Sequence, residues 1–360
     1  MKKILPVLLV AILMLFVQAF PALAASEQVE ELSLQKAIER AFAHSVDLHN
    51  TEMDIEKKEI SLDNVRWSMN GVMSGYNIPE ETDREVHKTF FNADLDYRVT
   101  EKKLDDQKRK LKIDVKEAYY NILLADKEIA NSKLRLAQTT IKHSQVNSKY
   151  KVGMATQLDV LTAQAQLEAE QTTLKEKNND LVNAYSQLNK LVGNQQDARP
   201  VLTDSIEYTP VEELDVDREV LKAVNNSFEI WSATEAAKTA QNLKYYETFY
   251  DVGEYNESQA RNTLADAKES IRLAARTYCL AIFNMQNQYG QLETQEKQLE
   301  EALKNITAQY QVGMVTKDAV DDIAVNLSNI KTAKEQLAAK HTKAREELQK
   351  LTGELDVTNK

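Results

Sequence analysis

Apolar residues recur along this chain with the spacing of long α-helices. From about Asp83 to Tyr150 they fall three to five residues apart, with no glycine or proline among them. This pattern predicts one helix of about 65 residues, about 100 Å long. After a short break, an apolar residue occupies every seventh position: Val160, Leu167, Leu174, Leu181 and Leu188. Heptad spacing predicts a helix packed against a neighbour with left-handed crossing.

The same plan then appears a second time. YKVGMATQLDV at 150–160 returns as YQVGMVTKDAV at 310–320, and residues 34–58 parallel residues 217–240. The last stretch again carries apolar residues at intervals of seven: Ile323, Ile330, Leu337, Ala344 and Leu351. Gly353 follows Gly193 at the same spacing that separates the two turns. The chain therefore contains an internal repeat.

These patterns predict the organisation of the chain. We expect a first helical repeat over 25–193 with its turn at 151–156, a linker over 194–216, a second repeat over 217–353 with its turn at 311–316, and a tail over 354–360. Gly71, Gly75 and Pro79 predict irregular structure in MNGVMSGYNIPEETD, residues 69–83. The predicted fold is all-α, with two tandem long antiparallel helical hairpins.

Composition supports long helices and leaves their setting open. Only 8 glycines and 5 prolines occur in 360 residues, and 28% of residues are charged. The heptad positions are flanked by Gln, Asn, Thr and Ser, as in TAQAQLEAEQTTLKEKNN. A narrow apolar seam with polar flanks fits a helix in a curved, water-facing wall. It also fits the solvated face of an ordinary bundle.

The start of the chain, over 1–24, predicts export. Lys2 and Lys3 precede an apolar stretch that ends in the small-residue site Ala22-Leu23-Ala24, which is the pattern of a cleaved secretory signal peptide. An uncleaved membrane anchor is the alternative. Cleavage would remove two lysines and change the net charge from −11 to −13. An acidic exported protein is a poor partner for nucleic acid. The signal peptide predicts a place in the cell envelope, in the periplasm or the outer membrane.

Catalytic chemistry is not indicated. Cys279 lies in the apolar run TYCLAIF, which favours a small core residue over a nucleophile. The five histidines are scattered, and no H-E-x-x-H, P-loop or G-x-S-x-G motif occurs. The pairs His44–Asp47 and His49–Glu52 could be loose metal ligands, but such surface pairs are common. We therefore predict neither an enzyme nor a bound cofactor or metal.

The repeated turn has its own physical interpretation. Gly153 can adopt the left-handed cap conformation, and Thr156 with Asp159 can cap the next helix. In the second copy, Thr316 is expected to keep the cap while Asp318 supplies the first-turn charge. Glycine and threonine need do no more than make the turn, but exposed valine and methionine at its tip favour a docking surface.

These motifs together resemble the TolC family of outer-membrane efflux ducts. The order is DVKEAYYNILLADKEIA, then Y-x-V-G-M-x-T, then DVLTAQAQLEAE and LNKLVG, with the turn duplicated. The resemblance implies a coiled-coil-like α-barrel protomer. Three chains would form a tube whose turns meet a periplasmic adaptor, which is linked to an inner-membrane pump. It makes these residues adaptor contacts: Val152, Gly153, Met154, Thr156, Val312, Gly313, Met314 and Thr316.

The resemblance also implies an acidic constriction. The family has two aspartates three residues apart after the second turn, where this chain has Ala319 and Asp322, with Asp318 and Asp321 beside them. A ring of Asp318, Asp321 and Asp322 would attract cations, although acidic residues are common at helix starts. Val315 replaces the family's basic residue, which argues against an arginine-based latch.

The membrane strands of that family are not evident. The candidate windows are VRWSMNGVMSGYNIP at 65–79 and LKYYETFYDVGEYNES at 243–258, and neither holds two strands of alternating polarity. We predict that the β-barrel strands are absent or vestigial. The aromatic residues there could touch a membrane surface or pack a cap.

Two functions follow from the sequence. The first is a duct component of a tripartite-type efflux or export system. The alternative is a non-transporting helical scaffold of the envelope. A tube should leave polar residues along one face of every long helix, whereas a rod should bury all its seams.

Overall fold

The computed structural model describes residues 30–74 and 79–356. The signal peptide predicted over residues 1–24 lies outside the described residues. The elements, in order, are β1 (Glu31–Leu32), α2 (Leu34–His44), α3 (Val46–Ser74), α4 (Glu80–Lys151), α5 (Gln157–Val192), β2 (Val201–Leu202), α6 (Val216–Asn226), α7 (Phe228–Leu243), the 3-10 turn η1 (Lys244–Tyr246), α8 (Tyr250–Gln311) and α9 (Lys317–Thr352).

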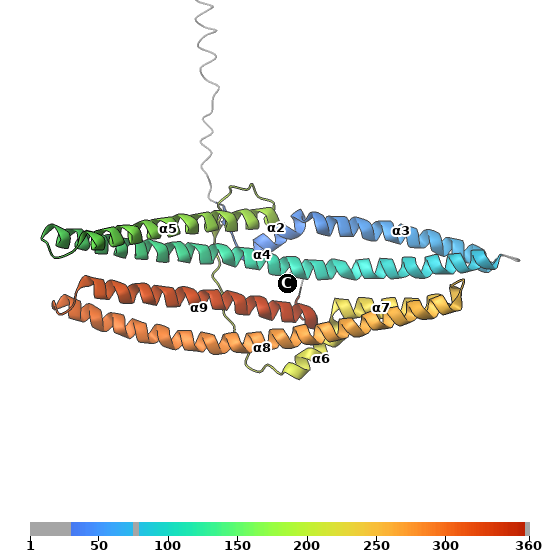
Figure 1. Ribbon diagram of the computed structural model, residues 1–360. Coiled ribbons are helices and arrows are strands. Elements are labelled where there is room, and N and C mark those ends of the chain that lie inside the picture. Colours follow the sequence, from blue (N-terminus) through green and yellow to red (C-terminus); the bar gives the residue numbers. More distant parts are fainter. Residues whose placement is uncertain (1–29, 75–78, 357–360) are drawn as a thin grey trace, which may run out of the picture.

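The predicted all-α hairpin repeats are confirmed in this part of the chain. Helices α2 to α5 form the first repeat, and α6 to α9 form the second (Figure 1). The first repeat is longer because α3 has 29 residues against 16 in α7, and α4 has 72 against 62 in α8. The extra residues therefore lengthen helices and add no new element within the described ranges.

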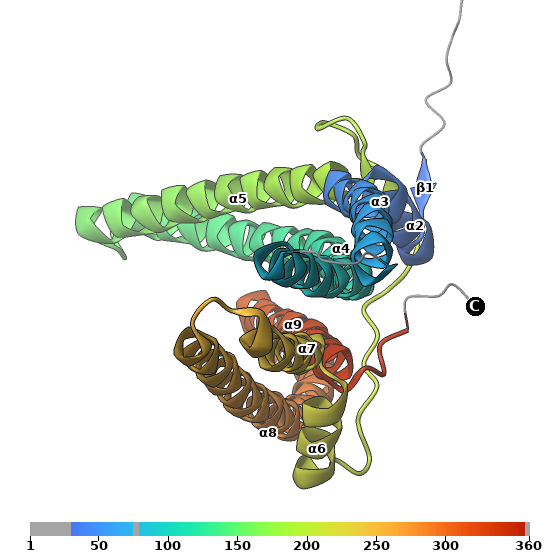
Figure 2. The ribbon, with the colours of Figure 1, turned by 90° about the vertical axis from the view of Figure 1, so that its right-hand side faces the viewer.

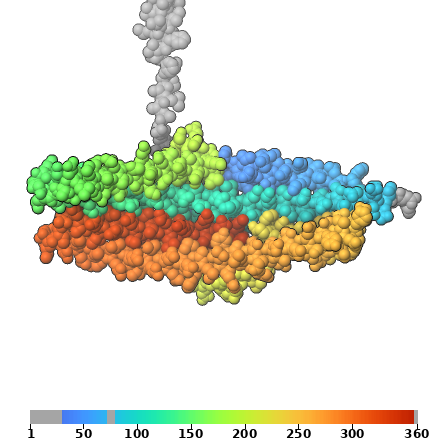
Figure 3. Space-filling model, in the orientation of Figure 1, coloured from blue at the N-terminus to red at the C-terminus, as the bar shows by residue number. Residues whose placement is uncertain are grey.

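The helices form an elongated wall. Helix α4 packs against α5 and α3 on one side and against α9 and α7 on the other, and α8 packs against α9 and α7. Figure 1 shows α3 continuing the line of α5, and α7 continuing the line of α9. Figure 3 shows the two repeats in contact along their length. One edge of the wall is therefore α3 with α5, and the other is α8.

Two apolar cores lie where a short helix packs against its long hairpin. One gathers around Leu32, Ala37, Tyr119 and Leu188, and the other around Ala223, Ala275, Cys279 and Ile282. Cys279 is fully buried, and burial raises the pKa of its thiol to about 11. The prediction of a core cysteine is thereby confirmed.

The linker crosses one face of the wall. Strands β1 and β2 pair in parallel where it begins. Farther along, the Thr342 hydroxyl on α9 donates to the Glu207 carbonyl at 3.0 Å, and the Gln286 amide on α8 donates to the Val211 carbonyl at 3.1 Å. Figure 2, viewed along the wall, shows β1, α2 and the linker on the same side.

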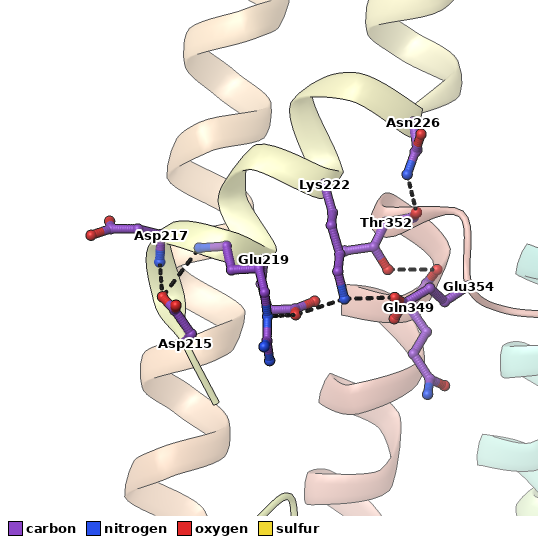
Figure 4. Close-up of polar contacts among 9 residues, drawn as sticks. Asp215, Asp217, Glu219, Lys222, Asn226, Gln349, Thr352 and Glu354 are labelled. Carbon is purple, nitrogen blue, oxygen red and sulfur yellow. Dashed lines mark hydrogen bonds and ion pairs between the residues drawn. The ribbon is translucent and has the colours of Figure 1, made fainter. Parts of the chain in front are cut away.

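Helix α6 is fastened to the end of α9 by polar contacts (Figure 4). The Asp215 carboxylate caps its first turn by accepting from the amides of residues 217 and 218. Lys222 bridges Glu219 and Glu354 at 2.9 and 2.7 Å, and the Asn226 amide donates to the Thr352 carbonyl at 2.8 Å. These contacts hold the first helix of the second repeat against the end of its last helix.

The prediction of irregular structure over residues 69–83 is wrong at both ends of that segment. Helix α3 runs through Gly71 to Ser74, and α4 begins at Glu80. Packing of α3 against α4 outweighs the cost of one glycine, which is about 1 kcal/mol in a helix interior. Among the described residues of the two windows considered for membrane strands, residues 65–74 are helical, and residues 243–258 hold the end of α7, η1 and the start of α8. No helix in the described ranges is long and apolar enough to cross a membrane.

Candidate docking turns

The two turns between long helices have the same backbone. Gly153 and Gly313 both have φ of +76°, in the left-handed region. The Met154 amide donates to the Lys149 carbonyl at 2.8 Å, and the Met314 amide to the Gln309 carbonyl at 2.9 Å. This six-to-one bond is the Schellman helix ending. The prediction that Gly153 takes the cap conformation is confirmed.

The turns place apolar side chains in solvent. Val152 and Met154 are 69% and 76% exposed, and Val312 and Met314 are 70% and 76% exposed. No atom lies within 4 Å of a Cβ built on Gly153 or Gly313, so the surface around each glycine is open. Most of the surface of these apolar side chains is therefore open to a partner.

The first turn is closed by a capping box. The Asp159 amide donates to the Thr156 hydroxyl at 3.2 Å, and the Thr156 amide donates to the Asp159 carboxylate at 2.7 Å. Hydrogen bonds from Thr156 hold the pKa of Asp159 below its usual range. The predicted cap is confirmed at this turn.

The prediction that the Thr316 side chain caps the helix after the second turn is wrong. Thr316 occupies the N-cap position of α9, but its side chain accepts no hydrogen bond from the first turn. The amide of Ala319 instead donates to the Thr316 carbonyl at 3.2 Å. Ala319 stands where the first copy has Asp159, so the reciprocal carboxylate is missing.

The predicted acidic residues lie on α9 beside α4. The Gln145 amide donates to Asp318 at 3.1 Å, Lys142 pairs with Asp322 at 3.0 Å, and Gln138 also donates to Asp322. Asp321 faces Lys317 on its own helix at 3.9 Å. Two of the three carboxylates thus tie the second hairpin to the first near the turns. The sequence contained no sign of this pairing, because cross-helix partners follow no period.

Farther from the turns, polar contacts set the register of α4 and α9. Lys116 pairs with Glu346 at 2.6 Å, Lys343 with Glu117 at 2.7 Å, and the Asn131 amide donates to the Thr332 hydroxyl at 2.7 Å. These residues lie between the two repeats. They hold the hairpins side by side.

A groove that the sequence did not predict lies where α4, α5 and α9 meet. Its volume is about 630 Å³, and its lining includes Glu117, Glu128, Asp180 and Lys340. Two of its lining residues, Tyr120 and Thr342, also bond to Glu207 of the linker. The groove therefore borders the contact between the linker and the wall.

Comparison with known proteins agrees with this geometry. Residues 92–194 match the family model described as outer membrane efflux protein. The matched residues span most of α4 and all of α5. The expected resemblance to TolC-family efflux proteins is thereby confirmed, and the family's description agrees with the predicted place in the cell envelope. No curated protein matches the chain.

Solved structures share the fold of this chain. A membrane protein from Pseudomonas aeruginosa matches with a TM-score of 0.68 at 12% identity, over 89% of this chain and 90% of that one. The CmeC outer membrane channel of Campylobacter jejuni matches at 0.66 and 12%, over 91% and 87%. The outer membrane protein VceC of Vibrio cholerae matches at 0.61 and 14%, over 89% and 96%. At these identities the likeness establishes the fold.

Proposed function

We propose that this protein is the duct component of an efflux or export system in the cell envelope, built as a closed ring of three chains. The observation that carries the proposal is a pair of exposed apolar stripes, one on each edge of the wall. One stripe lies on α3 and the other on α8.

The first stripe lies on α3. Val46, Met53, Ile60 and Trp67 recur every seven residues and are between 48% and 80% exposed. Leu48 and Leu62 are buried, and they follow Val46 and Ile60, respectively, by two positions. Two residues turn a helix by about 200°. The stripe therefore points away from α4, outward from the edge.

The second stripe lies on α8. Leu273 and Leu280 are exposed, and each precedes a fully buried residue, Ala275 or Ile282, by two positions. This stripe points outward from the opposite edge for the same geometric reason. A helix with apolar residues on two opposite sides has room for two neighbours, as in a wall that continues beyond one chain.

The two stripes lie at the same height along the wall. Lys58 on α3 donates to Thr100 on α4, and Arg98 on α4 pairs with Glu235 on α7. Lys244 in η1, directly after α7, pairs with Glu257 on α8. Counting along the antiparallel helices from these contacts puts Met53 level with Leu273 and Val46 level with Leu280. In a ring whose symmetry axis runs parallel to the long helices, rotation leaves every residue at the same position along that axis. The α3 stripe of one copy would therefore meet the α8 stripe of the next.

The proposed ring also suggests roles for the exposed turns and for the exposed aromatic residues. The exposed turns at one end would meet the periplasmic adaptor through Val152, Gly153, Met154, Thr156 and their second-copy equivalents. The adaptor would connect the ring to an inner-membrane pump. At the other end, exposed aromatic residues such as Tyr245 and Phe249 could contact a membrane surface.

The alternative, a non-transporting scaffold rod, fits the edges less well. A rod acting as a single chain should bury its apolar seams, whereas both stripes here are exposed. That the protein is not an enzyme and binds no cofactor stays a prediction. The boundaries predicted for the two repeats and the linker likewise stay proposals.

Paired cysteines test the ring. In a Cys279→Ala background, we expect Met53→Cys with Leu273→Cys to cross-link through a short bismaleimide into species of two and three chains and no larger. Each single variant should give dimers at most at background level. The pair Leu158→Cys with Leu273→Cys is the matched control, because those residues lie at different heights. Cross-linking that extends past three chains, or equal yields from the control pair, would contradict the closed ring.

A further inference from the structure

The two turns share a backbone but differ in the side chains around it. When the two copies are aligned, the exposed Leu158 and Leu161 of the first turn correspond to Asp318 and Asp321 of the second. The same alignment places Lys149 opposite Gln309, and Lys151 opposite Gln311. Over residues 149–162 the formal charge is +1, and over the equivalent residues 309–322 it is −2.

The first turn carries four exposed apolar side chains. Val152 and Met154 stand on the turn, and Leu158 and Leu161 follow on the first turns of α5, 72% and 59% exposed. Leu158 and Leu161 lie three residues apart, so their side chains are neighbours on the helix surface. At the second turn, aspartates interrupt the equivalent surface.

The lysines beside the first turn have no counter-charge within the described chain. Lys149 and Lys151 are exposed at the end of α4, and no ion pair joins either to a described carboxylate. The nearest acid in sequence, Asp159, is engaged by the Thr156 amide at 2.7 Å and hydroxyl at 2.8 Å. Two unpaired cations beside an apolar surface suit a partner with carboxylates around apolar side chains.

A second copy of this chain does not supply that partner. In the proposed ring, α5 would face α8 of the next copy. Both turns lie at the same end of the wall, so the second turn of that copy would lie nearest Leu158 and Leu161. Its carboxylates are already engaged, because Asp318 accepts from Gln145, Asp322 pairs with Lys142 and Asp321 faces Lys317. The lysines of the first turn are therefore left for a different protein.

We infer that the two turns are not equivalent docking sites. The first turn, with Val152, Met154, Leu158 and Leu161 flanked by Lys149 and Lys151, binds an adaptor segment whose apolar tip is flanked by carboxylates. The second turn, held to α4 through Asp318 and Asp322, does not bind that segment. A ring of three chains would then present three such sites, alternating with three acidic ones. This inference rests on the proposed function.

Designed helical hairpins provide the test. One probe carries two leucines at its tip flanked by glutamates, and its twin carries the same leucines flanked by lysines. Titrated against the full mature chain, the glutamate hairpin should bind and the lysine hairpin should not. Lys149→Glu with Lys151→Glu should weaken binding about tenfold, because two rim charges change sign. Leu158→Gln should weaken it as well.

The second turn supplies matched controls. Gln309→Glu with Gln311→Glu places the same two glutamates at the equivalent positions and should leave the affinity unchanged. Equal binding of both hairpins, binding of neither, or equal losses at the two turns would overturn the inference. A chain that forms trimers but does not discriminate contradicts only this inference. A chain that stays single contradicts the duct itself.

Discussion

At the scale of single residues, the surroundings of His341 constrain its charge. It is fully buried on α9 beneath the linker, and neither ring nitrogen has a hydrogen-bond partner. The Tyr208 ring lies 5.0 Å from it and stacks on Tyr289 at 3.6 Å. Burial, and then the positive charge of Arg345, lower the pKa of His341.

This lowered pKa predicts acid sensitivity. A histidine that must stay neutral contributes its full stability above the ordinary pKa of 6.5, and loses it as the pH falls from there towards the folded-state pKa. We therefore expect the free energy of unfolding to decrease between pH 7 and pH 5. His341→Phe keeps an aromatic ring next to Tyr208 and should flatten the decrease. Urea titrations at several pH values measure both, and parallel curves would refute the assignment.

Gly153 supports a second prediction at this scale. A Cβ there meets no atom, so the cost of alanine comes only from its φ of +76°. Gly153→Ala should destabilise the chain by about 1–2 kcal/mol. Gly71→Ala is the control, because Gly71 lies within α3 with nothing near its Cβ position, and should be neutral or stabilising by up to about 1 kcal/mol. Losses of similar size at both positions would contradict this account.

At the scale of elements, the two helix starts after the turns differ in a testable way. Thr156 caps α5 through a reciprocal box, whereas the Thr316 side chain makes no cap bond on α9. Thr156→Ala should cost about 1 kcal/mol of unfolding free energy. Thr316→Ala should cost a few tenths at most, because it removes no bond. Denaturant unfolding compares them, and a larger loss at Thr316 would refute the structural difference.

Elements of this kind were largely predictable from the sequence. Long helices without breakers, heptad seams and left-handed glycines are encoded locally, so α4, α5, α8 and α9 and both turns follow from spacing alone. The helical state of Gly71 was missed because packing on α4 decides it. The absent cap at Thr316 was missed because one residue, Ala319 in place of an aspartate, changes the geometry.

The candidate site was only partly predictable for the same reason. Exposed Val152 and Met154 follow from their place on a turn. The ties from Lys142 and Gln145 to Asp322 and Asp318 depend on how two hairpins far apart in sequence pack together. No periodic pattern carries that information.

At the scale of the whole molecule, the stripes on α3 and α8 predict how assembly fails. Met53→Glu places a carboxylate opposite Leu273 of the next copy, where burying an unpaired charge costs several kcal/mol. We expect this variant to fold with the same helix content but to lose its association. Glu56→Gln, on the same helix, should assemble normally. If the Met53→Glu variant still assembles, the interface does not lie at the α3 stripe.

The mass of the mature protein in solution tests the central claim most directly. Light scattering on the chain purified without the predicted signal peptide and without detergent reports the number of chains in each particle. The ring predicts three chain masses, unchanged on moderate dilution because the contact between stripes is apolar. A single chain mass, from protein with full helix content, would contradict the duct and leave the scaffold.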